Sequence, residues 1–343
     1  MIKSKVKILL IYTGGTIGMV KDFKTGSLKA FNFKNLLDRI PELQLLDCNI
    51  DTVSFKTPID SSDMHPKYWV QIAEIIETNY KDFDGFVILH GSDTMSYSAS
   101  ALSFMLENLA KPVVFTGSQL PIGDLRTDAK ENLITSIQVA SLQSEGKPVV
   151  KEVCLYFEYK LYRGNRTTKL NAEHFQAFVS SNYPDLAESG VHLKINTEYL
   201  FQPNTSKPLK VNKTLDENIA VVRLYPGISK VVLEHIFNVS SLKAVIIETF
   251  GAGNCTTEPW FINLLSEAIL KGVYIVNVTQ CSGGSVLMGH YETSSALKKI
   301  GVISGKDMTT EAAIAKLMFL LSKNISSNTF KTKYETALRG EMT

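Results

Sequence analysis

Short apolar runs that end in turn residues alternate along this chain with longer segments of helical period. The apolar runs lie at 6–11, 86–89, 113–115, 149–157, 219–224, 244–247 and 273–278, and the helical segments at 69–80, 96–109, 128–142, 259–270 and 311–321. Runs that are apolar on both faces are typical of buried parallel strands. The sequence therefore predicts an α/β fold.

The alternation lapses between residues 182 and 216, where the chain is polar and prolines such as Pro203 and Pro208 interrupt both periods. With 343 residues, the chain is also more than twice as long as one ordinary domain of about 150 residues. We therefore expect an amino-terminal domain over 1–190, a linker over 191–215 and a smaller carboxy-terminal α/β domain over 216–343.

The charge balance argues against several classes of partner. Lys and Arg total 36 against 34 for Asp and Glu, and no basic block is present of the kind that nucleic acid or an anionic membrane requires. The amino-terminal apolar run at 8–11 is shorter than the roughly 7 to 15 residues of a secretory signal, and no run approaches the roughly 18 residues of a membrane span. We expect a cytoplasmic protein with a small-molecule substrate and no nucleic-acid or membrane partner.

Three of the apolar runs end in glycines and small hydroxyl residues, at 12–18, 90–94 and 116–119. Ligands of an open parallel sheet bind at the carboxyl ends of its strands, where glycines admit close backbone approach. The glycine spacing fits neither a dinucleotide site nor a phosphate loop, and no nucleophile elbow is present. We expect His90 to be a packed histidine rather than a base. A hydroxyl nucleophile would then need another proton acceptor, for which Lys169 is a candidate.

Taken together, the loop motifs identify a family resemblance. The chain resembles the type I, cytosolic bacterial L-asparaginases of the asparaginase/glutaminase family in motifs that follow the family's order: YTGGTIGM at 12–19, DSSDM at 60–64, GFVILHGSDTM at 85–95, ALSFMLENL at 101–109, TGSQLP at 116–121, LYRGNRTTK at 161–169, YPGIS at 225–229, GAGN at 251–254 and NVTQC at 277–281. The resemblance extends over nearly the whole chain, and TGGTIG and HGSDTM are specific to this family.

The resemblance implies a fold, a reaction and an assembly. The fold has a larger domain with a parallel or mixed sheet and a smaller, flavodoxin-like carboxy-terminal domain. The reaction is the hydrolysis of L-asparagine to L-aspartate and ammonia through a threonine acyl-enzyme, with no metal or organic cofactor. The assembly is a homo-oligomer, a tetramer built as a dimer of dimers, with active sites at the intimate dimer interface.

The resemblance also assigns site residues. Thr16 in TGGTIG corresponds to the nucleophile. Ser92, Asp93 and Lys169 correspond to a cluster that relays a proton, in which Asp93 also pairs with the α-ammonium group of the substrate.

Further positions correspond to substrate-binding residues of the family. Asp60, Ser61 and Ser62 match the loop that clamps the α-carboxylate, although the same residues also suit a helix N-cap. Ser118 matches the position whose backbone carbonyl receives the amide nitrogen. Asn254 matches a residue that reaches the substrate from the neighbouring subunit.

Two departures from the family pattern affect the site. Ser92 stands where threonine is usual, which keeps the hydroxyl but loosens its rotamer. The stretch at 20–28 lacks the tyrosine that often hydrogen-bonds the nucleophile, and Tyr291 is our candidate for a substitute. Full turnover by a Tyr291→Phe variant would end that hypothesis.

Type I enzymes can be activated by a second asparagine bound at the dimer interface. Thr168 and Cys281 match this effector site, but Glu248 stands where an arginine for the effector carboxylate is expected. Since two carboxylates repel, we predict weak or absent activation by asparagine.

Other functions on the same scaffold remain open from sequence. A glutaminase-asparaginase differs in substrate by one methylene, worth only about 1 to 3 kcal/mol, so motifs do not decide selectivity. The related amidotransferase subunit normally has an extra amino-terminal domain before the nucleophile loop. Here that loop begins at Tyr12, which leaves no room for such a domain, so we do not expect this function. A non-catalytic amino-acid sensor would bind asparagine without releasing ammonia.

Overall fold

The computed structural model describes residues 5–21, 28–30, 40–289, 292–323 and 325–343. The chain forms two compact units, 1–213 and 214–343. The division falls near the carboxyl end of the segment for which a linker is predicted. Residues 193–195 of that segment form strand β15, which pairs with β14 of the first unit.

Unit 1 is built on a mixed sheet. Among the described residues this sheet has eight strands in the order β15-β14-β11-β10-β7-β5-β1-β4. Strands β4, β1, β5, β7 and β10 run parallel, whereas β10, β11, β14 and β15 pair antiparallel. Their bounds are β1 Val6–Gly14, β4 Cys48–Ile59, β5 Gly85–Leu89, β7 Val113–Thr116, β10 Val153–Phe157, β11 Lys160–Arg163, β14 Ala187–Ser189 and β15 Leu193–Ile195.

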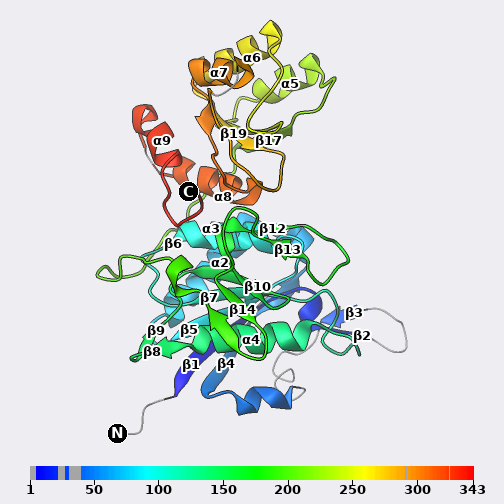
Figure 1. Ribbon diagram of the computed structural model, residues 1–343, viewed down its shortest axis with the longest axis vertical. Coiled ribbons are helices and arrows are strands. Elements are labelled where there is room, and N and C mark those ends of the chain that lie inside the picture. The colour runs from blue at the N-terminus through cyan, green and yellow to red at the C-terminus, as the bar shows by residue number, and fades with distance from the viewer. Residues whose placement is uncertain (1–4, 22–27, 31–39, 290–291, 324) are drawn as a thin grey trace. The chain divides into compact units, whose positions relative to one another are not determined.

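Helices cover both faces of this sheet (Figure 1). The side chains of Ile8, Leu10 and Val87 pack with Leu133 and Ile137 of α4 (Ala129–Ser141) in one buried cluster. The opposite face meets α2 (Pro66–Asn79) and α3 (Met95–Met105), as the stacking of the Phe86 ring on Tyr80 shows. Because the central strands are buried on both faces, they are apolar throughout, which is the pattern that made them predictable.

Short elements connect these layers. They are η1 Thr16–Gly18, β2 Met19–Lys21, β3 Leu28–Ala30, η3 Pro41–Leu45, η4 Ser61–Asp63, β6 Leu106–Glu107, β8 Gln143–Ser144, β9 Lys147–Pro148, η5 Gly164–Arg166, β12 Thr168–Lys169, β13 Phe178–Val179, η6 Thr197–Tyr199 and β16 Lys210–Val211. The helix predicted over 96–109 is too long: it ends at Met105, because Leu106 and Glu107 pair with β16 and Asn108 takes a positive φ of 61°.

Unit 2 has a smaller parallel sheet in the order β17-β18-β19-β20 in the part of the chain that the structure describes. Helices α5 to α7 pack on one face and α8 on the other (Figure 1). The bounds are β17 Ile219–Arg223, α5 Lys230–Phe237, β18 Ala244–Thr249, α6 Pro259–Leu270, β19 Tyr274–Thr279, α7 Glu292–Ile300, β20 Ile303–Ser304, α8 Thr310–Leu321 and α9 Ser327–Tyr334. The predicted α/β class, with a larger mixed-sheet unit and a smaller parallel-sheet unit, is confirmed.

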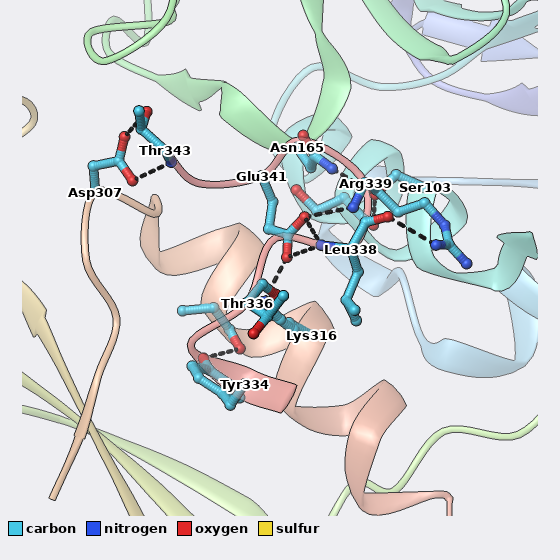
Figure 2. Close-up of polar contacts among 12 residues, drawn as sticks. Ser103, Asn165, Asp307, Lys316, Tyr334, Thr336, Leu338, Arg339, Glu341 and Thr343 are labelled. Atoms are coloured by element: carbon cyan, nitrogen blue, oxygen red, sulfur yellow. Dashed lines mark hydrogen bonds and ion pairs between the residues drawn. The ribbon is translucent and has the colours of Figure 1, made fainter. Parts of the chain in front are cut away.

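A buried ion pair joins the carboxyl-terminal segment of unit 2 to helix α8 (Figure 2). Lys316 of α8 lies 2.5 Å from the carboxylate of Glu341, and both side chains are fully buried. The Glu341 carboxylate also accepts hydrogen bonds from the backbone N–H groups of Leu338 and Arg339. Burial lowers the pKa of Lys316 below its ordinary value, while the Glu341 carboxylate opposes that shift.

Candidate active site

Backbone contacts bring the loops after β1, β4 and β5 together. Gly15 has a φ of 86°, and a Cβ built on it would lie 2.5 Å from the Cα of Gly91. A Cβ built on Gly91 would in turn lie 2.4 Å from the Oγ of Ser61. Only glycine permits such approach. The loops that contain the predicted nucleophile, the predicted carboxylate clamp and the predicted proton relay therefore meet at one edge of the sheet.

Thr16 is the first residue of η1 and is half-buried. It follows Gly15 directly, just as Ser92 follows Gly91, so both hydroxyl residues lie one position from the same backbone contact. The ring of Tyr12 packs beneath this turn, since a Cβ on Gly18 would lie 2.3 Å from its phenol group. Burial raises the pKa of Tyr12 to about 12, so this phenol is neutral.

The structure brings Ser92, Asp93 and Lys169 into direct contact. The Nζ of Lys169 donates to the Oγ of Ser92 at 2.8 Å and to Oδ1 of Asp93 at 2.7 Å. Strand β12 positions the lysine by pairing with β13. The Lys169 side chain is 16% exposed and that of Asp93 is 64% exposed, so the carboxylate faces solvent. A cationic ligand group could approach it there.

Gln119 completes this cluster, and sequence reasoning did not single it out. Its Oε1 accepts from the Oγ of Ser92 at 3.2 Å, and its Nε2 donates to the carbonyls of Ala172 and His174 at 3.0 Å each. It thereby ties Ser92 to the segment after Lys169. Its place in the TGSQLP motif, beside Ser118, was the only signal in the sequence.

The Asp60 loop has the geometry of a cap. The Asp60 carboxylate accepts from the backbone N–H of Ser62 at 2.9 Å and from the Ser62 hydroxyl at 2.8 Å. These hydrogen bonds hold the pKa of Asp60 below its ordinary value. Asp60 is thus the N-cap of η4, while Ser61 is buried and its carbonyl accepts from the Thr94 hydroxyl at 2.7 Å.

Ser118 lies two residues after β7 and is buried. Its hydroxyl donates to the carbonyl of Leu120 at 2.6 Å, and the preceding carbonyl, that of Gly117, accepts from Asn132 at 3.0 Å. These bonds hold the turn on which a substrate-facing carbonyl is predicted.

The remaining predicted site residues are divided between the units. Asn254 lies in unit 2, where its backbone closes a tight turn with Phe250 through hydrogen bonds of 2.9 Å and 2.8 Å. Thr168 belongs to β12 of unit 1, whereas Cys281 lies in unit 2 and is exposed. Tyr291, the candidate substitute for the missing tyrosine, lies outside the described residues.

Glu248, at the end of β18, has partners of its own in unit 2. Its Oε1 accepts from the hydroxyl of Thr310 at 2.7 Å, and its Oε2 lies 3.5 Å from Nη1 of Arg223. Its side chain is 12% exposed. Both carboxylate oxygens of Glu248 therefore have a partner within unit 2, at the position for which the family resemblance predicts an arginine.

Two further features concern the part of the chain that the structure describes. No group of three or more His, Cys, Asp or Glu side chains in that part of the chain is arranged to hold a metal ion. No helix there combines the length and the apolar character needed to cross a membrane.

Comparison with known proteins gives matches over both units. The family profile described as "Asparaginase, N-terminal" matches residues 7–200, and that described as "Glutaminase/Asparaginase C-terminal domain" matches residues 218–333. L-asparaginase 1 of Escherichia coli is 44% identical over 341 residues, which cover 99% of this chain and 98% of that protein.

Solved structures agree with this result. The crystal structure of L-asparaginase I from Vibrio cholerae matches with a TM-score of 0.90 and 43% identity, covering 99% of this chain and 100% of that one. The thermostable L-asparaginase from Thermococcus kodakarensis matches with a TM-score of 0.88 and 31% identity, covering 98% and 99%.

Proposed function

Because the chain belongs to the asparaginase family, we propose that it is an L-asparaginase, which hydrolyses L-asparagine to L-aspartate and ammonia. The observation that supports this most directly is the contact of Lys169 with both Ser92 and Asp93, beside the loop of Thr16. A hydroxyl nucleophile needs a group that accepts its proton, and such a cluster of hydroxyl, amine and carboxylate can relay one.

In the proposed reaction the Oγ1 of Thr16 attacks the carbon of the side-chain amide. The proton of the Thr16 hydroxyl passes through Ser92 and Lys169 to the amide nitrogen, the C–N bond breaks, ammonia leaves and an ester of Thr16 remains. Water then hydrolyses that ester: its oxygen becomes part of the carboxylate of aspartate, and one of its protons restores the Thr16 hydroxyl. No step needs a redox partner or a metal-bound water.

The rest of the site is proposed to bind the amino-acid end of the substrate. The exposed carboxylate of Asp93 suits an α-ammonium group, and the loop of Asp60, Ser61 and Ser62 suits an α-carboxylate. The Ser118 carbonyl would receive the amide nitrogen. Asn254 of a second subunit would complete the pocket.

We propose a homo-oligomer in the cytoplasm, a dimer of dimers, on the basis of the family resemblance. Exposed apolar side chains on unit 2 are consistent with a subunit interface, since Tyr225, Val231 and Val232 are 56%, 58% and 54% exposed. Sedimentation of the purified protein tests this assignment, and a monomer would contradict it.

Ammonia release from L-asparagine and from L-glutamine is the test of the proposed function. We expect release from asparagine, loss of release of at least about 1000-fold in Thr16→Ala, and partial activity in Thr16→Ser, which keeps a hydroxyl. Binding of asparagine without any release of ammonia would instead favour the amino-acid sensor. Equal rates on both amides would favour the glutaminase-asparaginase.

A further inference from the structure

His90 directly follows strand β5 and is fully buried between the sheet and the helix that comes next in the chain. Its Nδ1 lies 2.7 Å from the carbonyl oxygen of Gly91, and its Nε2 lies 2.9 Å from the Oγ of Ser98 on α3. The indole N–H of Trp69 on α2 donates to the same Ser98 Oγ at 2.8 Å. A continuous chain of hydrogen bonds thus runs from α2 through α3 to the Gly91 loop.

The chemistry of these groups sets the direction of every bond in the chain. The Gly91 carbonyl can only accept, so the Nδ1 of His90 donates to it and bears the single proton of the neutral ring. The Nε2 then has no hydrogen and accepts from the hydroxyl of Ser98, which in turn accepts from the Trp69 indole, a group that can only donate. Burial lowers the pKa of His90 to about 4, so the ring is neutral near pH 7 and keeps this tautomer.

The Gly91 carbonyl belongs to the peptide that joins Gly91 to Ser92. A bond to this oxygen therefore orients the residue whose hydroxyl contacts Lys169, and it does so where Gly91 touches Gly15 and Ser61. The backbone of His90 is equally confined, because a Cβ on Gly117 would lie 2.3 Å from its carbonyl oxygen. One buried ring thus lies at the junction of the loops that form the site.

We infer that His90 is a positioning residue for the proposed reaction: its bond from Nδ1 to the Gly91 carbonyl holds Ser92 and Asp93 where Lys169 reaches both. This inference rests on the proposed function. His90 acts through Gly91 and not on the substrate, which separates it from a general base.

A matched pair of serines on α3 tests the inference with little change in volume. Ser98→Ala removes the hydrogen bond to the Nε2 of His90, so the ring is then held only by its bond to the Gly91 carbonyl. Ser100→Ala is the control: Ser100 is as fully buried, and among the described residues its hydroxyl has no hydrogen-bond partner. We expect kcat on asparagine to fall about 3- to 10-fold in Ser98→Ala, the worth of one hydrogen bond, and to stay at the parent value in Ser100→Ala.

Two substitutions of His90 distinguish the roles of its two ring nitrogens. The side-chain nitrogen of Asn is as many bonds from Cβ as Nδ1, and that of Gln is as many as Nε2. His90→Asn therefore keeps a donor toward Gly91, whereas His90→Gln keeps an acceptor toward Ser98, because its amide oxygen is as many bonds from Cβ as its nitrogen. We expect kcat/KM within about tenfold of the parent for Asn and a loss on the order of 100-fold for Gln, mainly in kcat.

The parent protein is assayed first, so that the two hypotheses fail separately. A parent that releases no ammonia overturns the proposed function and this inference with it. An active parent with equal kcat in Ser98→Ala and Ser100→Ala, or with Asn and Gln at position 90 equally active, overturns the inference alone. Melting temperatures of all variants are recorded, and if both His90 variants fail to fold, the serine pair decides.

Discussion

At the scale of single residues, the burial of His90 predicts how stability depends on pH. Burial lowers its pKa from an ordinary value of 6.5 to about 4, so the unfolded chain binds a proton on this residue at a higher pH than the folded chain. The free energy of unfolding that this residue contributes is present in full above pH 6.5 and is lost as the pH falls toward 4. The loss is about 3 kcal/mol.

Urea unfolding of the parent and of His90→Asn between pH 7 and pH 4 measures this contribution. The variant is expected to be less stable at pH 7, because it loses ring contacts, but to lose about 3 kcal/mol less on acidification. Parallel pH dependences of the two proteins would contradict the prediction.

The site residues show what a sequence can indicate at this scale. Ser92, Asp93 and Lys169 were predicted together because they fall in recognisable motifs, although the lysine is 76 residues from the carboxylate it contacts. Gln119 was not predicted, because no sequence motif distinguishes an amide side chain with a role in the site from any other. Its role depends on a tertiary contact with Ser92. The bond from His90 to Gly91 was equally invisible, since only the fold fixes which nitrogen bears the proton.

At the scale of elements, the tight connection from β1 to η1 predicts how one added methyl group, in Gly15→Ala, changes stability and activity. Ala at position 15 would adopt a φ of 86° that L residues avoid, and its Cβ would collide with Gly91. Gly146, in the turn between β8 and β9, has a φ of 76° but nothing within 4 Å of a built Cβ. A substitution by Ala at position 146 therefore introduces backbone strain alone, whereas one at position 15 introduces both strain and a collision.

Gly15→Ala and Gly146→Ala are expected to share a strain cost of about 1 to 2 kcal/mol in the free energy of unfolding. Only Gly15→Ala should also lower kcat/KM, by 100-fold or more, because the Thr16 and Ser92 loops must separate. Ammonia release and denaturant unfolding of both variants are the measurements. Comparable activity of the two would show that the loops tolerate separation.

Elements differ in how well their sequences predict them. The buried strands β5, β7, β18 and β19 were found because both of their faces are apolar. Strand β4 is longer than any of these and was missed, since it lies at one edge of the sheet and many of its side chains are exposed. The antiparallel β11, β14 and β15 have only three or four residues each, too few to show a period of two clearly.

At the scale of the whole molecule, the carboxyl-terminal ion pair predicts how unit 2 responds to loss of one charge. Glu341→Gln leaves the ammonium of Lys316 buried without its carboxylate, which is expected to cost about 3 to 5 kcal/mol. Glu234→Gln is the control, since its pair with Lys230 is exposed and is worth less than about 0.5 kcal/mol. Guanidinium unfolding compares them, and similar midpoints would refute the difference.

Regulation by asparagine also concerns the whole molecule, because the family resemblance places the effector site between two subunits. Glu248, which contacts Thr310 and Arg223, stands where the family resemblance predicts an arginine for the effector carboxylate, and two carboxylates repel. Initial rates against asparagine concentration are therefore expected to follow a hyperbola with a Hill coefficient near one. A clearly sigmoidal curve from the pure protein would refute this expectation.

The sequence contains two tryptophans, and each unit has one of them. Trp69 is buried on α2 at the far end of the hydrogen-bond chain to His90, while Trp260 is partly buried at the start of α6 against the ring of Phe261. Indole emission depends on polarity and hydrogen bonding, so Trp260→Phe leaves a fluorescence signal that reports on unit 1 alone, and Trp69→Phe leaves one for unit 2. The chain thus has an intrinsic optical probe in each half, by which the order in which the units unfold can be followed without a label.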